Sequence, residues 1–244
     1  MRYMSKYFFA ATIIFIILSC KGKVEPAIQS GIDECENCSM IINSVDQGAV
    51  AIDSEEQTHT FCSPVCMISW INSMKQQGKT AAEQYYLFDH NDFAPLPAEN
   101  SIIVHGDFNT AMGYGLLAFR NEDAAKSFAA ESHGELLNWN DLRVNHEIPD
   151  RKIILDCSTG AEPAAFEVNK NEVVSICIEN PSVQDCQISL KGYDLDFKLS
   201  SDSSCGGFVA DKPGQGFVFV NFENEILASL HVTGEHTDEE KNYQ

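Results

Sequence analysis

The sequence predicts two domains of different class, an α+β N-terminal domain and an all-β sandwich. Residues 32–143 contain short apolar strands and helix-capping sequences, arranged as two successive hairpin-helix units. Residues 153–236 contain only short β-rich runs separated by turn residues. The chain has 244 residues, which is long enough for two domains of ordinary size.

Residues 1–19 have the composition of an export signal. Arg2 and Lys6 supply positive charge, and the apolar run from Tyr7 to Leu18 is too short to predict a membrane span. The run ends in Ile17-Leu18-Ser19-Cys20, which resembles the lipobox of bacterial lipoproteins. The resemblance implies cleavage before Cys20 and a lipid anchor on its thiol; an ordinary secretory peptide is the alternative.

Polar segments flank the two expected domains. Residues 20–31 form a tether, residues 144–152 form a charged linker, and residues 237–244 form a polar tail. An exported, lipidated chain is expected in the cell envelope, facing the periplasm. Lys21 after the anchor permits transfer to the outer membrane under the proteobacterial sorting rule, so both membranes remain open.

Charge and motifs exclude several classes of function. The formal net charge is −20, with 16 Lys and Arg against 36 Asp and Glu. Such a chain lacks the basic surface that phosphate binding requires, so we expect no nucleic-acid partner. No Ser-His-Asp or paired-carboxylate signature is present, and we therefore expect a protein that is not an enzyme.

In the N-terminal domain, Gly48–Asp53 alternates as a strand and Thr58–Phe61 pairs back with it across a turn. Ser63 and Pro64 then start a helix, as a side-chain cap followed by proline at the first helical position, and Gly78 ends it. The second unit has strands at Tyr85–Phe88, Ile102–His105 and Leu116–Phe119, a helix from Asn121 to Ser132, and a last strand beginning at Leu136.

The C-terminal half shows strand patterns alone. About seven strands at such spacing are typical of a sandwich. They are expected at Phe166–Val168, Val173–Ile178, Cys186–Leu190, Phe197–Leu199, Phe208–Ala210, Gly216–Asn221 and Ile226–Val232.

Four cysteines form two closely spaced pairs, Cys35-x-x-Cys38 and Cys62-x-x-x-Cys66. A hairpin separates the pairs and the second pair opens a helix, so the four thiols can converge on a metal. The thioethers of Met40 and Met67 make the local donors soft, which favours Cu(I). Met67 also continues the apolar helical face, the ordinary position of a core residue.

Two alternatives to a metal site remain open for these cysteines. Export to an oxidising compartment makes two structural disulfides the default interpretation. Cys35-x-x-Cys38 could also indicate a thiol oxidoreductase, although the motif precedes any strand instead of opening a helix after one.

Residues 31–143 contain an ordered set of motifs. They are Cys35-x-x-Cys38-Ser39-Met40, the hairpin ending at Phe61, the Ala111-Met112-Gly113 loop, and the run from Leu117 to Ala124 that leads into a helix ending at His133-Gly134. Together these motifs resemble NosL, a family of lipoproteins that supply copper to nitrous oxide reductase. The resemblance implies a Cu(I) chaperone with Cys38, Met40 and Met112 as ligands, Cys35 in support, and the reductase or its copper-insertion machinery as partner.

The chain departs from the family pattern at Cys62 and Cys66. This pair is similar to the cysteine signature of small heavy-metal-binding domains called TRASH, and it could complete a four-thiolate site. Such a site also suits Zn²⁺, so a structural or regulatory zinc-thiolate lipoprotein is the alternative function.

The C-terminal domain resembles a cupredoxin that has lost its copper ligands. The run from Phe208 to Gly214 and the strand after it carry the resemblance. At the offsets of the family's ligands, this chain has Asn221, Glu225, Ser229 and Val232. We expect the remaining cysteines to be buried or disulfide-bonded: Cys157, Cys177, Cys186 and Cys205.

Overall fold

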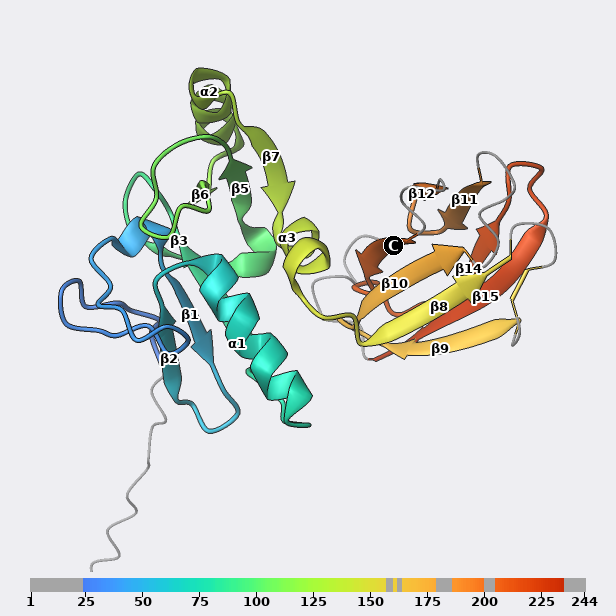
Figure 1. Ribbon diagram of the computed structural model, residues 1–244, viewed down its shortest axis with the longest axis horizontal. Coiled ribbons are helices and arrows are strands. Elements are labelled where there is room, and N and C mark those ends of the chain that lie inside the picture. Colours follow the sequence, from blue (N-terminus) through green and yellow to red (C-terminus); the bar gives the residue numbers. More distant parts are fainter. Residues whose placement is uncertain (1–23, 157–159, 162–163, 179–185, 200–204, 235–244) are drawn as a thin grey trace, which may run out of the picture.

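The computed structural model describes residues 24–156, 160–161, 164–178, 186–199 and 205–234. They form two bodies that lie side by side along the longest axis of the molecule (Figure 1). The predicted signal, the lipid anchor Cys20, Cys157 and the tail 237–244 lie outside the described residues. Within the described part of the chain, no helix is long and apolar enough to cross a membrane.

The first sheet of the N-terminal domain has the strand order β2-β1-β3-β4. Its strands are β1 (Ala49–Ile52), β2 (Thr58–Phe61), β3 (Gln84–Phe88) and β4 (Pro95–Pro97). The central strand β1 is buried at all four positions, and it pairs antiparallel with β2 and β3. Asp53 closes the β1–β2 turn, since its Oδ1 accepts hydrogen bonds from the backbone N–H groups of Glu55 and Gln57.

Helix α1 (Pro64–Gln76) begins directly after β2 and packs on this sheet. Ser63 caps it by accepting a hydrogen bond from the backbone N–H of Cys66 at 3.0 Å. Met67 and Ile68 are fully buried, so Met67 is a core residue, as its position in the helical pattern predicts.

The second sheet has the order β6-β5-β7, with β5 (Ile102–His105), β6 (Leu116–Phe119) and β7 (Glu135–Asn138). Helix α2 (Glu122–Ser132) packs against it and is capped by Asn121, as expected. The prediction of two equivalent hairpin-helix units is wrong in one respect, because the strand predicted at Tyr85–Phe88 pairs with β1 in the first sheet. The choice of pairing partner depends on tertiary contacts, and the periodicity of a strand does not indicate them.

The domain has a third helix, α3 (Trp139–His146), which the sequence pattern does not predict. Its start is a capping box in which Asn138 and Asp141 exchange side-chain to backbone hydrogen bonds of 2.9 Å. Trp139 and Leu142 are buried in the same core as the cysteines. The short 3-10 helices η1 (Val45–Gln47) and η2 (Ala98–Asn100) complete the domain.

The predicted linker, residues 144–152, is too long. Its first three residues belong to α3 and its last two to β8 (Arg151–Leu155), the first strand of the C-terminal domain. Two acidic residues of this segment, Glu147 and Asp150, form ion pairs where the two domains meet. Lys75 of α1 binds Glu147 at 2.5 Å and Asp150 at 2.7 Å, and Arg143 donates to the backbone carbonyl of Asn171 in the second domain.

The C-terminal domain is all-β, as expected, and consists of two sheets around one core. One sheet has the order β13-β10-β8 and the other β12-β11-β14-β15-β9. The remaining strands are β9 (Ala165–Asn169), β10 (Val173–Ile178), β11 (Cys186–Lys191), β12 (Leu195–Leu199), β13 (Cys205–Val209), β14 (Gly214–Val220) and β15 (Ile226–Thr233).

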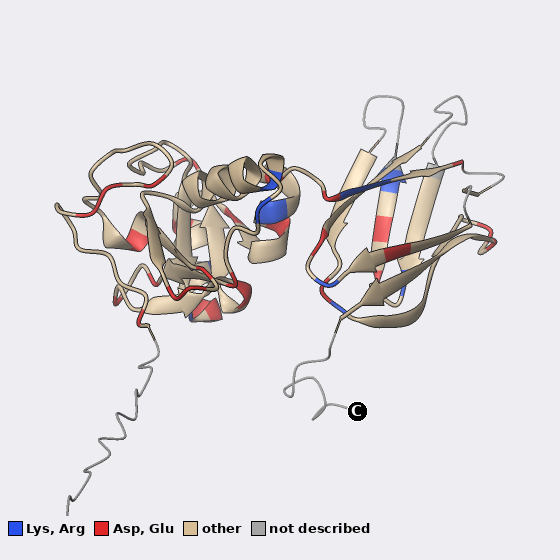
Figure 2. Ribbon diagram, turned by 90° about the horizontal axis from the view of Figure 1, so that it is seen from below, with Lys and Arg blue, Asp and Glu red and all other residues tan. Residues whose placement is uncertain are grey.

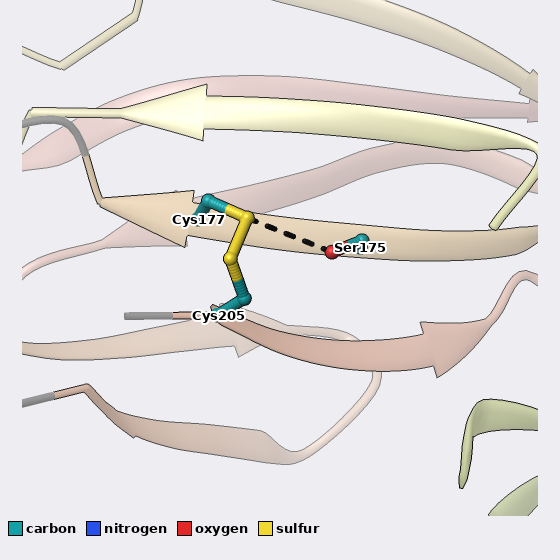
Figure 3. Close-up of a disulfide and its surroundings, with 3 residues drawn as sticks. All are labelled: Ser175, Cys177 and Cys205. Atoms are coloured by element: carbon teal, nitrogen blue, oxygen red, sulfur yellow. Dashed lines mark hydrogen bonds between the residues drawn. A yellow bond between two sulfur atoms is a disulfide. The ribbon is translucent and has the colours of Figure 1, made fainter. Parts of the chain in front are cut away.

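A disulfide joins Cys177 of β10 to Cys205 of β13, which are direct cross-strand partners (Figure 3). This pairing confirms the expectation for these two cysteines. It also shows that Cys177 and Cys205 are chemically separate from the cysteines of the N-terminal domain, whose four thiols are free. Cys157 and the side chain of Cys186 lie outside the described part of the chain.

Candidate metal centre

Four cysteine sulfurs of the N-terminal domain meet at one point. The Sγ atoms of Cys35, Cys38, Cys62 and Cys66 all lie within 4.8 Å of one another. Cys62 Sγ is 3.6 Å from Cys38 Sγ and 3.6 Å from Cys66 Sγ. When two sulfurs bind one tetrahedral metal through bonds of about 2.3 Å, the two sulfurs are separated by roughly the distance seen here. The cysteines therefore need to move little to form a thiolate site.

The first pair of cysteines lies in a tight turn, here called the knuckle (residues 35–40). The backbone N–H of Cys35 donates to the carbonyl of Met40 at 2.8 Å, and that of Ser39 donates to the carbonyl of Cys35 at 2.7 Å. Ser39 adopts the left-handed conformation that closes the turn, with φ of 60°. The turn points both thiols to one side.

Hydrogen bonds to β2 hold the knuckle in place. The backbone N–H of Glu36 donates to the carbonyl of Thr60 at 2.9 Å, and the Thr60 hydroxyl donates to the carbonyl of Glu34 at 3.0 Å. The second pair follows at once along the chain, since Cys62 lies between β2 and the cap Ser63, and Cys66 lies in the first turn of α1. The order of knuckle, strand and helix therefore brings the two pairs together.

The local environment lowers the pKa of Cys35 and raises the pKa of Cys62 and Cys66. Cys66 donates its thiol hydrogen to Cys35, and backbone N–H groups add to this, so the pKa of Cys35 falls to about 4. Burial raises the pKa of Cys62 to about 12. The pKa of Cys66 is also raised, because its ionisation would break the hydrogen bond that it donates to Cys35 and because its thiol is buried. At neutral pH Cys35 is therefore a thiolate while Cys62 and Cys66 keep their protons, so binding a metal through Cys62 or Cys66 releases protons.

Exposure distinguishes one thiol from the other three. Cys35, Cys62 and Cys66 are 1%, 4% and 3% exposed, whereas Cys38 is partly exposed. Any molecule that reaches the cluster from solvent therefore meets the sulfur of Cys38 first.

Met112 lies in the loop between β5 and β6, here called the Met112 loop (residues 106–115). Its side chain is partly buried and packs on the same core as the cysteines, including Cys38. It also lines a narrow crevice with Cys62. The structure thus brings this predicted ligand to the edge of the cysteine cluster, from a different sheet.

Two hydrogen bonds and a close backbone approach fix the Met112 loop. The Gln47 side-chain carbonyl accepts a hydrogen bond from the backbone N–H of Ala111 at 2.6 Å, and the Thr110 hydroxyl oxygen accepts one from that of Gly115 at 3.0 Å. Gly115 has φ of +58°, and a Cβ there would lie 2.0 Å from the carbonyl oxygen of Gly106. No sequence motif marks Gln47 or Gly115 as part of the site, since only the fold brings them to this loop.

Met40 is the last residue of the knuckle, and its side chain is 49% exposed. Two histidines of the N-terminal domain have carboxylate partners: His59 contacts Asp53 at 3.3 Å, and His105 contacts Glu135 at 3.1 Å. Tyr114 is marked by no motif either, yet it lines the crevice with Met112. Burial raises the pKa of Tyr114.

Two of the positions at the expected offsets of cupredoxin ligands, Asn221 and Glu225, hydrogen-bond to each other. Asn221 is buried and donates through Nδ2 to Glu225 at 3.0 Å, while its Oδ1 accepts two backbone hydrogen bonds. Across the described residues, the four cysteines of the N-terminal domain are the one group of three or more His, Cys, Asp or Glu side chains close enough to hold a metal.

Comparison with known families fits this arrangement of residues. The NosL family model matches residues 27–146, which begin before the knuckle and end with α3. The N-terminal domain of this chain belongs to the NosL family. The match includes all four cysteines and Met112, so the NosL domain and the cysteine cluster coincide.

Several solved structures are similar to parts of the chain. The copper chaperone NosL from Shewanella denitrificans is 23% identical over 48% of this chain and 93% of its own, with a TM-score of 0.39. The metal-binding domain of the Streptococcus pneumoniae Cu(I)-exporting ATPase CopA is 19% identical over 34% of this chain and 85% of its own, at 0.29. Plastocyanin from Dryopteris crassirhizoma is 16% identical over 34% and 99%, at 0.28. No curated protein matches the chain.

Proposed function

We propose that this protein is a membrane-anchored Cu(I) chaperone that delivers copper to nitrous oxide reductase during maturation of the enzyme. The observation that carries the proposal is the cluster of four free thiols, within 4.8 Å of one another, in a NosL domain. Thiolate and thioether sulfur are soft donors, and they favour Cu(I) over harder divalent ions.

Cys38, Met40 and Met112 are the proposed ligands of the transferred ion, with Cys35 in support. Cys35 is already a thiolate at neutral pH, because its pKa lies near 4. Met112 adds a donor that needs no deprotonation and forms no disulfide, which is useful in an oxidising compartment. Cys62 and Cys66 extend the donor set within the same cluster.

Release proceeds by ligand exchange at the one accessible thiol. A sulfur ligand of the acceptor would bind Cu(I) at Cys38, and the bonds to the buried cysteines would then break one at a time. Lipidation at Cys20 would keep the chaperone at the envelope membrane, facing the periplasm. We propose no catalytic role for any residue.

A zinc-thiolate module is the second candidate, and the complete set of four cysteines favours it. A structural Zn²⁺ site uses four tetrahedral ligands and contributes directly to folding. The two functions differ in the role of Met112, which a zinc site made of four cysteines does not need.

The test is anaerobic metal analysis of the full chain by mass spectrometry, followed by competition with a Cu(I) chelator. Met112→Ala is expected to weaken Cu(I) binding roughly tenfold or more, since one of few ligands is lost. Met74→Ala is the matched control, because Met74 is also partly buried against the same core but lies on α1. Retained zinc, with unfolding when it is removed, would favour the second candidate, and equal Cu(I) affinity in both variants would remove Met112 from the site.

A further inference from the structure

The segment that carries Cys38 exposes three large apolar side chains. Ile32 is 68% exposed, Met40 49% and Ile41 42%, and all three belong to the segment that carries the knuckle. Single exposed apolar side chains are ordinary, but three of the ten large apolar side chains that are exposed among the described residues fall within ten positions of the chain. We call these three residues with Cys38 the exchange face.

Backbone pairing holds Ile32 and Ile41 in one short ribbon that leads to the knuckle. Glu34 and Ile41 form a bridge, the backbone N–H of Gly31 donates to the carbonyl of Ile42 at 2.8 Å, and that of Ile42 donates to the carbonyl of Asp33 at 2.9 Å. In this short ribbon Cys35 and Ile42 point into the core, so Ile32 and Ile41 lie on the opposite, outer side. The ribbon ends at the knuckle, where Cys38 opens to solvent.

The same region has no positive charge. Residues 24–74 contain eight Asp and Glu and no Lys or Arg, and residues 80–119 contain five Asp and Glu and again no Lys or Arg. In Figure 2 the visible blue residues of the N-terminal domain lie beside the sandwich, whereas its outer loops carry red alone. Lys75, which ends the first of these two stretches, is paired with Glu147 and Asp150.

We propose that the exchange face is the docking surface for the copper acceptor, and that the acceptor meets it with an apolar patch rimmed by Lys and Arg around a sulfur ligand. This inference rests on the proposed chaperone function and adds the surface and the partner's chemistry. Apolar contact desolvates Cys38 during exchange, and the acidic surroundings attract a basic partner over distances beyond direct contact.

The experiment measures the rate of Cu(I) transfer from the full chain, purified in detergent, to apo nitrous oxide reductase and to a small Cu(I) chelator. Ile32→Ser with Ile41→Ser should slow transfer to the reductase at least about fivefold and leave transfer to the chelator unchanged. Glu34→Gln, or an increase in salt from about 50 to about 500 mM, should also slow transfer to the reductase, as expected for opposite charges that salt screens (Debye length about 10 Å at 0.1 M). Ile226→Ser in the sandwich is the matched control, since Ile226 is 69% exposed.

The failures of the two proposals are distinguishable. A wild-type chain that binds no Cu(I) refutes the chaperone function itself. A chain that binds Cu(I) but transfers none to the reductase refutes the proposed client, and the docking partner falls with it. Transfer that is insensitive to salt and to Ile32 and Ile41, or that Ile226→Ser slows equally, overturns the exchange face alone.

Discussion

Gly115→Ala tests whether the Met112 loop must be held in place for the metal site to function. Gly115 has φ of +58°, and a methyl group there would lie 2.0 Å from the Gly106 carbonyl oxygen, a separation that must open to at least 3.0 Å. The Gly106 N–H donates to the carbonyl of Gly115 at 2.9 Å, so the clash falls on the contact that closes the loop. We expect the substitution to move Met112 away from Cys62.

Gly113→Ala separates this displacement from the cost of an unfavourable backbone angle. Gly113 also has positive φ, +69°, but a methyl group there would have no atom within 4 Å. Both variants bear about 1 kcal/mol for an alanine in the left-handed region. Only Gly115→Ala adds the backbone clash.

The assay is Cu(I) competition with a chelator, alongside urea unfolding of each apo variant. Gly115→Ala should weaken Cu(I) binding roughly 10- to 100-fold, as for other losses of support to a metal ligand, and Gly113→Ala should bind like the wild type. The reasoning would be refuted if the two variants lost equal stability and both retained wild-type affinity, because the loop would then position nothing.

Two further predictions concern protons and the domain junction. Because the pKa of Cys62 is about 12, it is protonated at neutral pH, and binding a metal through it must release a proton. Apparent Cu(I) affinity should therefore rise up to about tenfold per pH unit between about pH 6 and pH 8, and a flat profile would show that Cys62 is not a ligand. Lys75→Met should destabilise the protein by about 3 kcal/mol in urea unfolding, because it removes one partner of Glu147, whose side chain is 1% exposed. Lys126→Met, which breaks an exposed pair with Glu122, should be nearly neutral, and equal losses would contradict the role of the junction.

The sequence predicts the cysteine cluster well because local rules position each thiol. The Ser63 cap, the Pro64 start and the β1–β2 turn all lie within a few residues of the motif, and each occurs as expected. The structure also removes one alternative, since the four thiols are free and no disulfide joins them. The identity of the metal stays a prediction.

The other side of the site is less predictable because it depends on long-range contacts. Gln47 reaches Ala111 across 64 positions, and the sequence carries no signal for that pairing. Tyr114 looks like an ordinary loop tyrosine until the fold brings it against the crevice beside Met112. Helix α3 does carry a signal, since Asn138 and Asp141 have the spacing of a capping box, but its short apolar pattern resembles the end of the preceding strand.

The lack of Lys and Arg between Val24 and Met74 makes the cysteine cluster accessible to peptide mapping. Trypsin cleaves after Lys and Arg, so all four cysteines of the cluster remain in one peptide, Val24–Lys75, separate from Cys177 and Cys205. Brief alkylation of the native apo protein should add one group to this peptide, at the partly exposed Cys38, and alkylation after unfolding should add four. The mass of a single peptide would therefore count, in intact membranes, how many thiols of the chaperone are free, oxidised or protected by metal.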